Sequence, residues 1–199
     1  MRRSVLLSVL LAIFSVSSFA ALPPQFSTCL SGDSSTTPVG DIKDIAKVAR
    51  VTYCQNQTGL TSKDDTLDML KNKNIDLGIS LAKTSYSKED LMDLAKVGHY
   101  VLYVDSPKIE KEYLIDLAKA GVQLVVMSAT SGLSISDLKD LAKAKSYVFN
   151  VNSLMVKDDL KDLVGLKVQV VIRSSQSGIT KDDIVEVAKV NSDLVVVMP

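Results

Sequence analysis

The chain contains a single histidine, His99, and only two cysteines. It has no Cys-x-x-Cys pair, no Gly-x-Ser-x-Gly turn and no glycine-rich phosphate loop. These absences argue against a zinc site, a serine nucleophile and a nucleotide site. A lone histidine is more often structural or exposed than catalytic. The sequence therefore predicts no metal ligands, no cofactor and no enzymatic activity.

Acidic residues are plentiful, but they occupy repeated helix positions, where capping and solvation account for them. No pair of carboxylates stands out as a glycosidase pair. A hydrolase acting on cell-wall or other polysaccharides stays open as a third hypothesis, and it requires a cluster of carboxylates in a groove.

The sequence also lacks an excess of charge of one sign, since 23 basic residues balance 23 acidic ones. Without Arg2 and Arg3 the net charge is −2. Both signs are mixed within Asp-x-x-Asp-x-x-Lys segments, which is typical of a solvated helix face. With no basic stripe, we expect no nucleic-acid partner.

No apolar run is long enough to span a bilayer comfortably. The longest, Val5–Val16, follows Arg2 and Arg3 and precedes a small-x-small site at Ser18-Phe19-Ala20. This order predicts a signal peptide over residues 1–20, cleaved near Ala20, with an uncleaved anchor as the alternative. We expect a periplasmic or secreted protein without a stable membrane anchor.

Residues 21–40 differ in composition from the rest, with Pro23-Pro24 and several serines and threonines, and they predict an extended, non-repetitive leader. In an exported chain the pair Cys29 and Cys54 favours a disulfide, which would hold the leader over the first repeat. Two free buried thiols are the alternative.

Residues 41–199 repeat with a period of about 23 residues. Each unit pairs a short helix-forming segment with a run of β-formers. Units this short cannot close a TIM barrel. The pattern predicts one domain, an open α/β solenoid of about seven helix–strand units, with a parallel sheet on one side and short helices on the other. The clearest helix copies are Asp41–Lys47, Asp90–Lys96, Glu112–Lys119, Asp137–Lys143 and Asp183–Lys189.

Helix starts are marked by hydroxyl residues, Ser87, Ser134 and Thr180, each with an aspartate three residues later. This spacing predicts capping boxes. The units starting at Lys108 and Val156 lack the hydroxyl. Within the helices, apolar residues recur at i, i+3 and i+4, and this stripe makes Leu117 and Leu141 candidate core residues.

The order of short strand, small polar turn, capped helix and Leu-Ala in residues 119–142 resembles leucine-rich repeats of the ribonuclease-inhibitor type. The resemblance covers residues 41–199. Small polar residues stand near the place of that family's asparagine ladder: Asp105-Ser106, Ser128, Asn152-Ser153 and Ser174-Ser175. The resemblance implies a horseshoe or arc whose strand face binds other proteins.

Strand alternation divides the strand residues between two faces. We expect one face to point at the helices: Leu77, Ile79, Val101, Tyr103, Leu124, Val126, Val170, Ile172, Leu194 and Val196. The other, unusually apolar face is the predicted partner-binding surface: Asp76, Tyr100, Leu102, Gln123, Val125, Tyr147, Phe149, Gln169, Val171, Asp193 and Val195. Two alternatives remain open, a register that is off by one residue and an internal segment that covers this face.

The leading functional hypothesis is an exported, non-enzymatic repeat protein that binds an unidentified protein through this strand face. The alternative is a self-assembling structural subunit or a component of a cell-envelope or secretion-related assembly. It rests on the apolar terminal strand at residues 194–198, whose uncapped edge would allow homo-oligomers. Asn56 lies in a glycosylation sequon.

Overall fold

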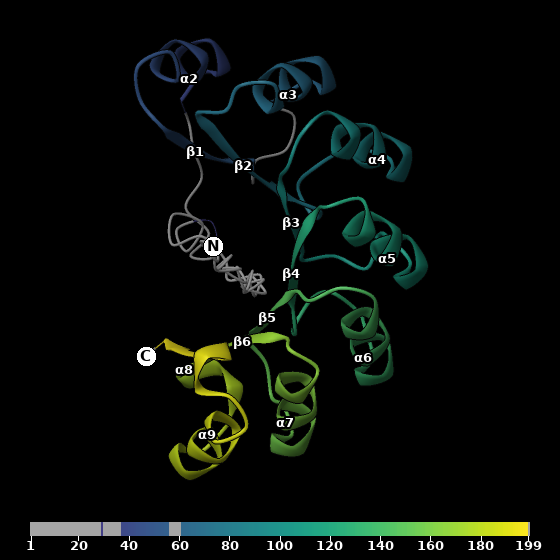
Figure 1. The fold of residues 1–199 in the computed structure, drawn as a ribbon, viewed down its shortest axis with the longest axis vertical. Helices are drawn as coiled ribbons and strands as arrows, with labels where there is room; N and C mark the ends of the chain where they lie inside the picture. The colour runs from purple at the N-terminus through teal and green to yellow at the C-terminus, as the bar shows by residue number, and fades with distance from the viewer. Residues whose placement is uncertain (1–28, 30–36, 56–60, 199) are drawn as a thin grey trace, which may run out of the picture.

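The computed structural model describes residue 29 and residues 37–55 and 61–198. Seven parallel strands form one sheet in the order β1-β2-β3-β4-β5-β6-β7, so each strand pairs with its neighbours in sequence (Figure 1). The open solenoid with a parallel sheet is therefore confirmed. The strands are β1 (Val51–Gln55), β2 (Ile75–Ser80), β3 (Val101–Val104), β4 (Gln123–Met127), β5 (Val148–Val151), β6 (Gln169–Arg173) and β7 (Val195–Met198).

Each strand is reached through a helix, and these crossover helices lie on the outer side of a curved sheet (Figure 1). We call the sheet face that they cover the helix-side face and the opposite face the concave face. The helices are α2 (Val39–Ile45), α3 (Lys63–Leu70), α4 (Lys88–Val97), α5 (Lys111–Lys119), α6 (Ile135–Ala144), α7 (Lys157–Gly165), α8 (Ser174–Ser177) and α9 (Lys181–Ala188), and the 3-10 turn η2 (Ser192–Leu194) precedes β7.

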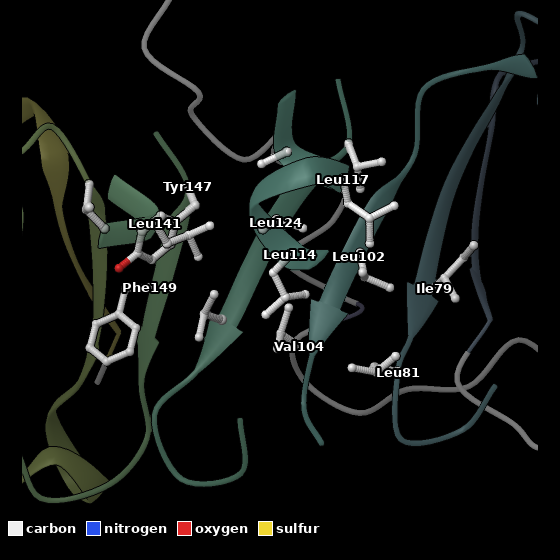
Figure 2. Close-up of a cluster of buried hydrophobic side chains, with 14 of the residues drawn as sticks. Ile79, Leu81, Leu102, Val104, Leu114, Leu117, Leu124, Leu141, Tyr147 and Phe149 are labelled. Atoms are coloured by element: carbon white, nitrogen blue, oxygen red, sulfur yellow. The ribbon is translucent and has the colours of Figure 1, made fainter. Parts of the chain in front are cut away.

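The main core lies between the helices and the helix-side face. Leu117 of α5 and Leu141 of α6 are completely buried in it, as the apolar stripe predicted. Figure 2 shows them among strand residues such as Leu102, Leu124 and Phe149. A helix of about ten residues is marginally stable alone, so each one depends on docking against the sheet and its neighbours.

Some helix starts have side-chain caps and others do not. Ser87 and Ser134 form complete capping boxes at α4 and α6, and the Thr180 hydroxyl accepts from the Asp183 amide at α9. The helices between them, α5 and α7, have no side-chain cap at Glu110 and Val156. The three hydroxyl caps and the uncapped starts of α5 and α7 were predicted, but at Thr180 only the hydroxyl half of the predicted capping box is present. Ser62 caps α3 in the same way, so two successive helices, α3 and α4, are both capped.

Lysines join successive helices through ion pairs, at α2–α3, α3–α4, α5–α6, α6–α7 and α7–α9. The first residue of α5, Lys111, lies 3.1 Å from Asp137 and 3.2 Å from Asp140 of α6. Lys63 in α3 and Lys157 in α7 make the equivalent pairs with α4 and α9. Pairs this exposed contribute little individually, about 0–1 kcal/mol each.

The small polar residues after the strands join successive turns. Asp105 accepts from the Ser80 hydroxyl at 2.6 Å and from the Ala82 amide at 2.7 Å. Two repeats later, Asn152 accepts from the Ser128 hydroxyl at 3.1 Å and from the Ala129 amide at 3.0 Å. These bonds satisfy turn amides that would otherwise lack partners, which is the structural role of a polar ladder.

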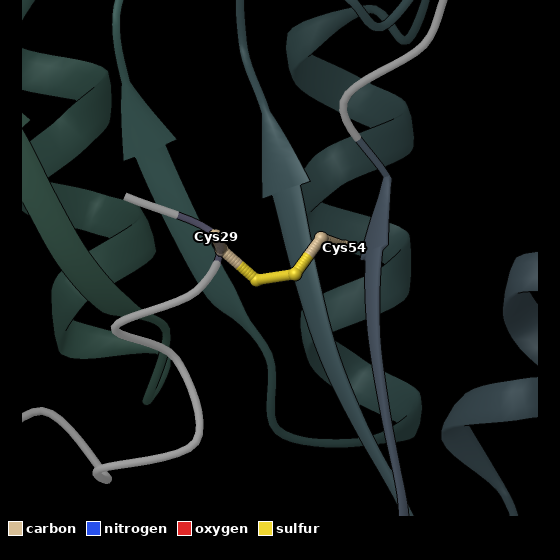
Figure 3. The surroundings of a disulfide bond; sticks show 2 residues. All are labelled: Cys29 and Cys54. Atoms are coloured by element: carbon tan, nitrogen blue, oxygen red, sulfur yellow. A yellow bond between two sulfur atoms is a disulfide. The ribbon is translucent and has the colours of Figure 1, made fainter. Parts of the chain in front are cut away.

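The predicted disulfide is confirmed. Cys29 and Cys54 are bonded, with 5.6 Å between their Cα atoms, and the bond lies at the face of the sheet (Figure 3). Disulfides are typical of proteins that fold outside the reducing cytosol. Among the described helices, none has both the length and the apolar character needed to cross a membrane. The proposed signal peptide and the Asn56 sequon lie outside the described residues.

Candidate ligand-binding site

The predicted strand face is divided by the structure between the two sides of the sheet. Val125 and Val171 do belong to the concave face, and Asp76, Gln123 and Gln169 share it by alternation. The aromatic and leucine members do not. Tyr100, Leu102, Tyr147 and Phe149 are buried in the helix-side core, Val195 packs against the same core, and Asp193 lies in η2.

The assignment for β3, β5 and β7 was therefore off by one residue. Val101 and Tyr103, expected to face the helices, lie on the concave face, and Val196 pairs in register with the concave residue Val171. In β3 and β5 the burial pattern is continuous, so apolar residues occupy both faces and alternation gives no signal.

The concave face is also not an open apolar surface. Its apolar cluster consists of Val101, Tyr103, Val125, Val148 and Val171, and these side chains are at most 6% exposed. A partner-binding patch requires exposed apolar area. The strand face as predicted thus contains no free apolar surface for a protein partner.

A pocket of about 310 Å³ opens instead at the amino-terminal ends of β2, β3 and β4. Three polar side chains lie in its wall, Asp76, His99 and Gln123. Its remaining lining residues are Leu77, Tyr100, Val101 and Gly121.

Backbone geometry explains how two loops meet at this pocket. α4 ends at Gly98 in an extended conformation, where any Cβ would come within 2.7 Å of the Leu70 carbonyl oxygen. α5 instead turns at Gly121, whose φ of +102° is strained for an L side chain. A Cβ on Gly121 would lie 3.5 Å from His99 Nδ1, so the imidazole lies against this turn.

The charge of the pocket is balanced. Arg50 donates to both oxygens of Asp76, from Nε at 2.6 Å and from a terminal nitrogen at 2.8 Å. The hydrogen bonds and the charge of Asp76 raise the pKa of the Arg50 guanidinium. A bidentate pair of this kind fixes the carboxylate in one orientation and cancels its charge. The pocket consequently presents fixed hydrogen-bonding groups without a net charge from this pair.

A second pocket, of about 330 Å³, lies between the loops that precede α5 and α6. Its charged lining includes Lys111 and Asp137, which are already joined in the inter-helix ion pair. Those side chains are accounted for by the helix ladder, so this pocket is the weaker candidate.

Sequence reasoning treated His99 as structural or exposed and did not place it with Asp76 and Gln123. The three residues are separated by more than twenty positions from one to the next, and only the strand register brings them together. The available signal was Gly98 before His99 and Gly121 two positions before Gln123, which mark two unusual turns at one sheet edge. Among the described residues, no cluster of three His, Cys, Asp or Glu is placed to hold a metal ion.

Comparisons with known proteins give structural likeness only. No family model and no curated protein matches the chain. Among solved structures, an aldolase named QR15 has a TM-score of 0.39 and 10% identity, with 77% of this chain and 80% of that chain covered. A mandelate oxidase variant with 4-Br-2-hydroxy-methylphenylacetate has a TM-score of 0.36 and 12% identity, with 74% and 64% covered.

These findings correct the functional prediction from sequence. The hypothesis of a non-enzymatic repeat protein that binds through its strand face is contradicted, and neither it nor the structural-subunit alternative is retained. The predicted binding face is divided between the two sides of the sheet, and its apolar side chains are buried within the chain. At these TM-scores the likeness transfers no activity to this protein.

Proposed function

We propose that this chain is an exported protein that binds a small, uncharged, hydrogen-bonding molecule in the pocket at the amino-terminal ends of β2, β3 and β4. The observation that carries the proposal is the convergence of Asp76, His99 and Gln123 on one pocket. Export, with cleavage near Ala20 and release to the periplasm or beyond, is supported by the disulfide and by the apolar run Val5–Val16 that precedes it.

The size of the pocket limits the ligand. A volume of about 310 Å³ is at the small end of ligand sites, which suits a molecule the size of a monosaccharide or a short polyol. The pairing of Asp76 with Arg50 disfavours a strongly charged ligand, because neither a cation nor an anion would find an uncompensated opposite charge there. Carboxylate, imidazole and amide groups together can both accept from and donate to hydroxyl groups.

The proposal is tested by calorimetric titration of the purified protein with glucose, N-acetylglucosamine, glycerol and glycinamide as probes. Binding of at least one of them is expected. Gln123→Ala should then weaken binding by about 2- to 12-fold, the effect of one neutral hydrogen bond.

Gln169→Ala is the matched control. Gln169 is the same residue type on the same concave face, but it belongs to β6 and does not line the pocket. Its removal should leave the affinity unchanged. The proposal is wrong if no probe binds, or if Gln123→Ala and Gln169→Ala weaken binding equally.

A further inference from the structure

The concave cluster poses a packing question separate from the pocket. Val125 and Val148 are completely buried although they point away from every helix of the repeats. Apolar side chains on a sheet face become buried only when another layer covers them. The helices supply that layer on one side of the sheet, so the concave side needs a covering segment of its own.

One described residue outside the repeats reaches this cluster. Cys29 packs against it and is tied to Cys54 of β1, 25 positions later in the chain. Cys54 pairs in register with Gly78, which has no side chain to occupy the concave face at that point. The disulfide therefore holds the leader on the concave side of the sheet.

The sequence around Cys29 has the composition that such a layer requires. Phe26 and Leu30 lie within three positions of Cys29 in the sequence. Three residues of chain span at most about 10 Å, so a leader anchored at Cys29 can bring both side chains onto the cluster that this cysteine reaches.

A buried polar group on the same face points to the same conclusion. Asn150 is fully buried, its amide nitrogen donates to Met127 Sδ at 3.3 Å, and its Oδ1 has no hydrogen-bond partner in the described part of the chain. A buried acceptor without a donor is costly. The hydroxyls of Ser27, Thr28 and Ser31, next to the cysteine, are donors of the kind it needs.

We propose that residues 22–31 of the chain's own leader dock on the concave face, with Phe26 and Leu30 seated on the cluster of Val101, Tyr103, Val125, Val148 and Val171 and with the disulfide as the anchor. The face is then an intramolecular interface between the leader and the repeats.

Photocrosslinking tests the placement directly. Phe26 is replaced by p-benzoyl-phenylalanine in the oxidised full chain, the protein is irradiated, and the adducts are mapped by mass spectrometry. We expect crosslinks within one chain to peptides that contain β3, β4 or β5. The control carries the same crosslinker at Val48, which is 89% exposed beyond α2, and should give no adduct to these strands.

Two crosslinking outcomes would overturn the proposal. Adducts between two chains would assign the concave face to a second copy. Adducts confined to other segments, or no adducts in a folded protein, would show that Phe26 does not lie there.

A substitution experiment checks the same interface without a crosslinker. Phe26→Asp combined with Leu30→Asp should raise the fluorescence of bound 1-anilinonaphthalene-8-sulfonate several-fold, because the cluster loses its cover. Far-UV circular dichroism should keep its native shape, since the helix-side core is separate. Val48→Asp is the charge-matched control. Dye fluorescence equal to that of the control would contradict the docking.

Discussion

Phe149 gives the sharpest test of how the two sheet faces are assigned. Alternation in the sequence placed it on a binding face, where its loss would leave the fold intact. In the structure it is 1% exposed and packs in the helix-side core, between the sheet and its covering helices (Figure 2). Phe149→Ala should therefore destabilise the protein by about 3–5 kcal/mol, from lost burial and the cavity left behind.

This loss is measurable by urea unfolding followed by circular dichroism. For a domain of this size, each kcal/mol lowers the melting temperature by about 2–4 °C, so a fall of roughly 6–20 °C is expected. Val48→Ala, at a position 89% exposed, should change stability by less than about 0.5 kcal/mol. A loss below about 1 kcal/mol for Phe149→Ala, with an unchanged denaturant slope, would refute the assignment of β5.

Three further changes test the anchor and the caps. Cys54→Ser opens the bond to Cys29 across 25 positions and should cost about 3.5 kcal/mol by loop entropy, read as a lower urea midpoint than that of the oxidised protein. Ser134→Ala removes one capping box and should cost about 0.5–2 kcal/mol by the same assay, whereas alanine at the uncapped Val156 should cost less. Hydrogen bonds from Ser134 and Lys111 lower the pKa of Asp137 to about 2. The ionised Asp137 carboxylate therefore stabilises the folded protein fully above the unfolded-state pKa of 3.8, and this stabilisation is lost as the pH falls towards 2. The Asp137→Asn variant should accordingly be less stable than the native protein at pH 6. The difference in their free energies of unfolding should shrink between about pH 4 and pH 2. A difference that stays constant over this range would contradict the lowered pKa of Asp137.

Features that depend on local spacing were predictable from the sequence. The capping hydroxyls, the stripe through Leu141 and the pairing of two cysteines in an exported chain each follow from a few neighbouring residues or from simple counting. The parallel sheet followed as well, because a helix between successive strands supplies the crossover connection that parallel pairing needs.

The candidate site depends on information that is not local. Asp76 and Gln123 could be placed on one face by alternation, and the structure agrees. His99 joins them through the turn geometry at Gly98 and Gly121, which fixes where a loop side chain lies. Nothing in the spacing of the three residues along the chain indicates that they share a pocket.

The error at β3 and β5 has a specific cause in how the helices end. After α5 the turn at Gly121 is left-handed, and the inward strand residue Leu124 comes seven positions after the helix residue Leu117. After α4 the connection through Gly98 is extended, and the inward residue Leu102 comes eight positions after Leu94.

The next pair of repeats shows the same alternation. α7 is followed by the left-handed Lys167, and α6 ends in the extended Lys145. One additional residue inverts the parity of every side chain in the strand that follows. In both extended cases the strand is preceded by a tyrosine, Tyr100 or Tyr147, whose hydroxyl donates to a carbonyl of the preceding helix at 2.8 or 3.0 Å. Side-chain parity therefore alternates over the four strands β3 to β6. An interpretation that gives every repeat the same helix-to-strand connection assigns β3 and β5 to the wrong face.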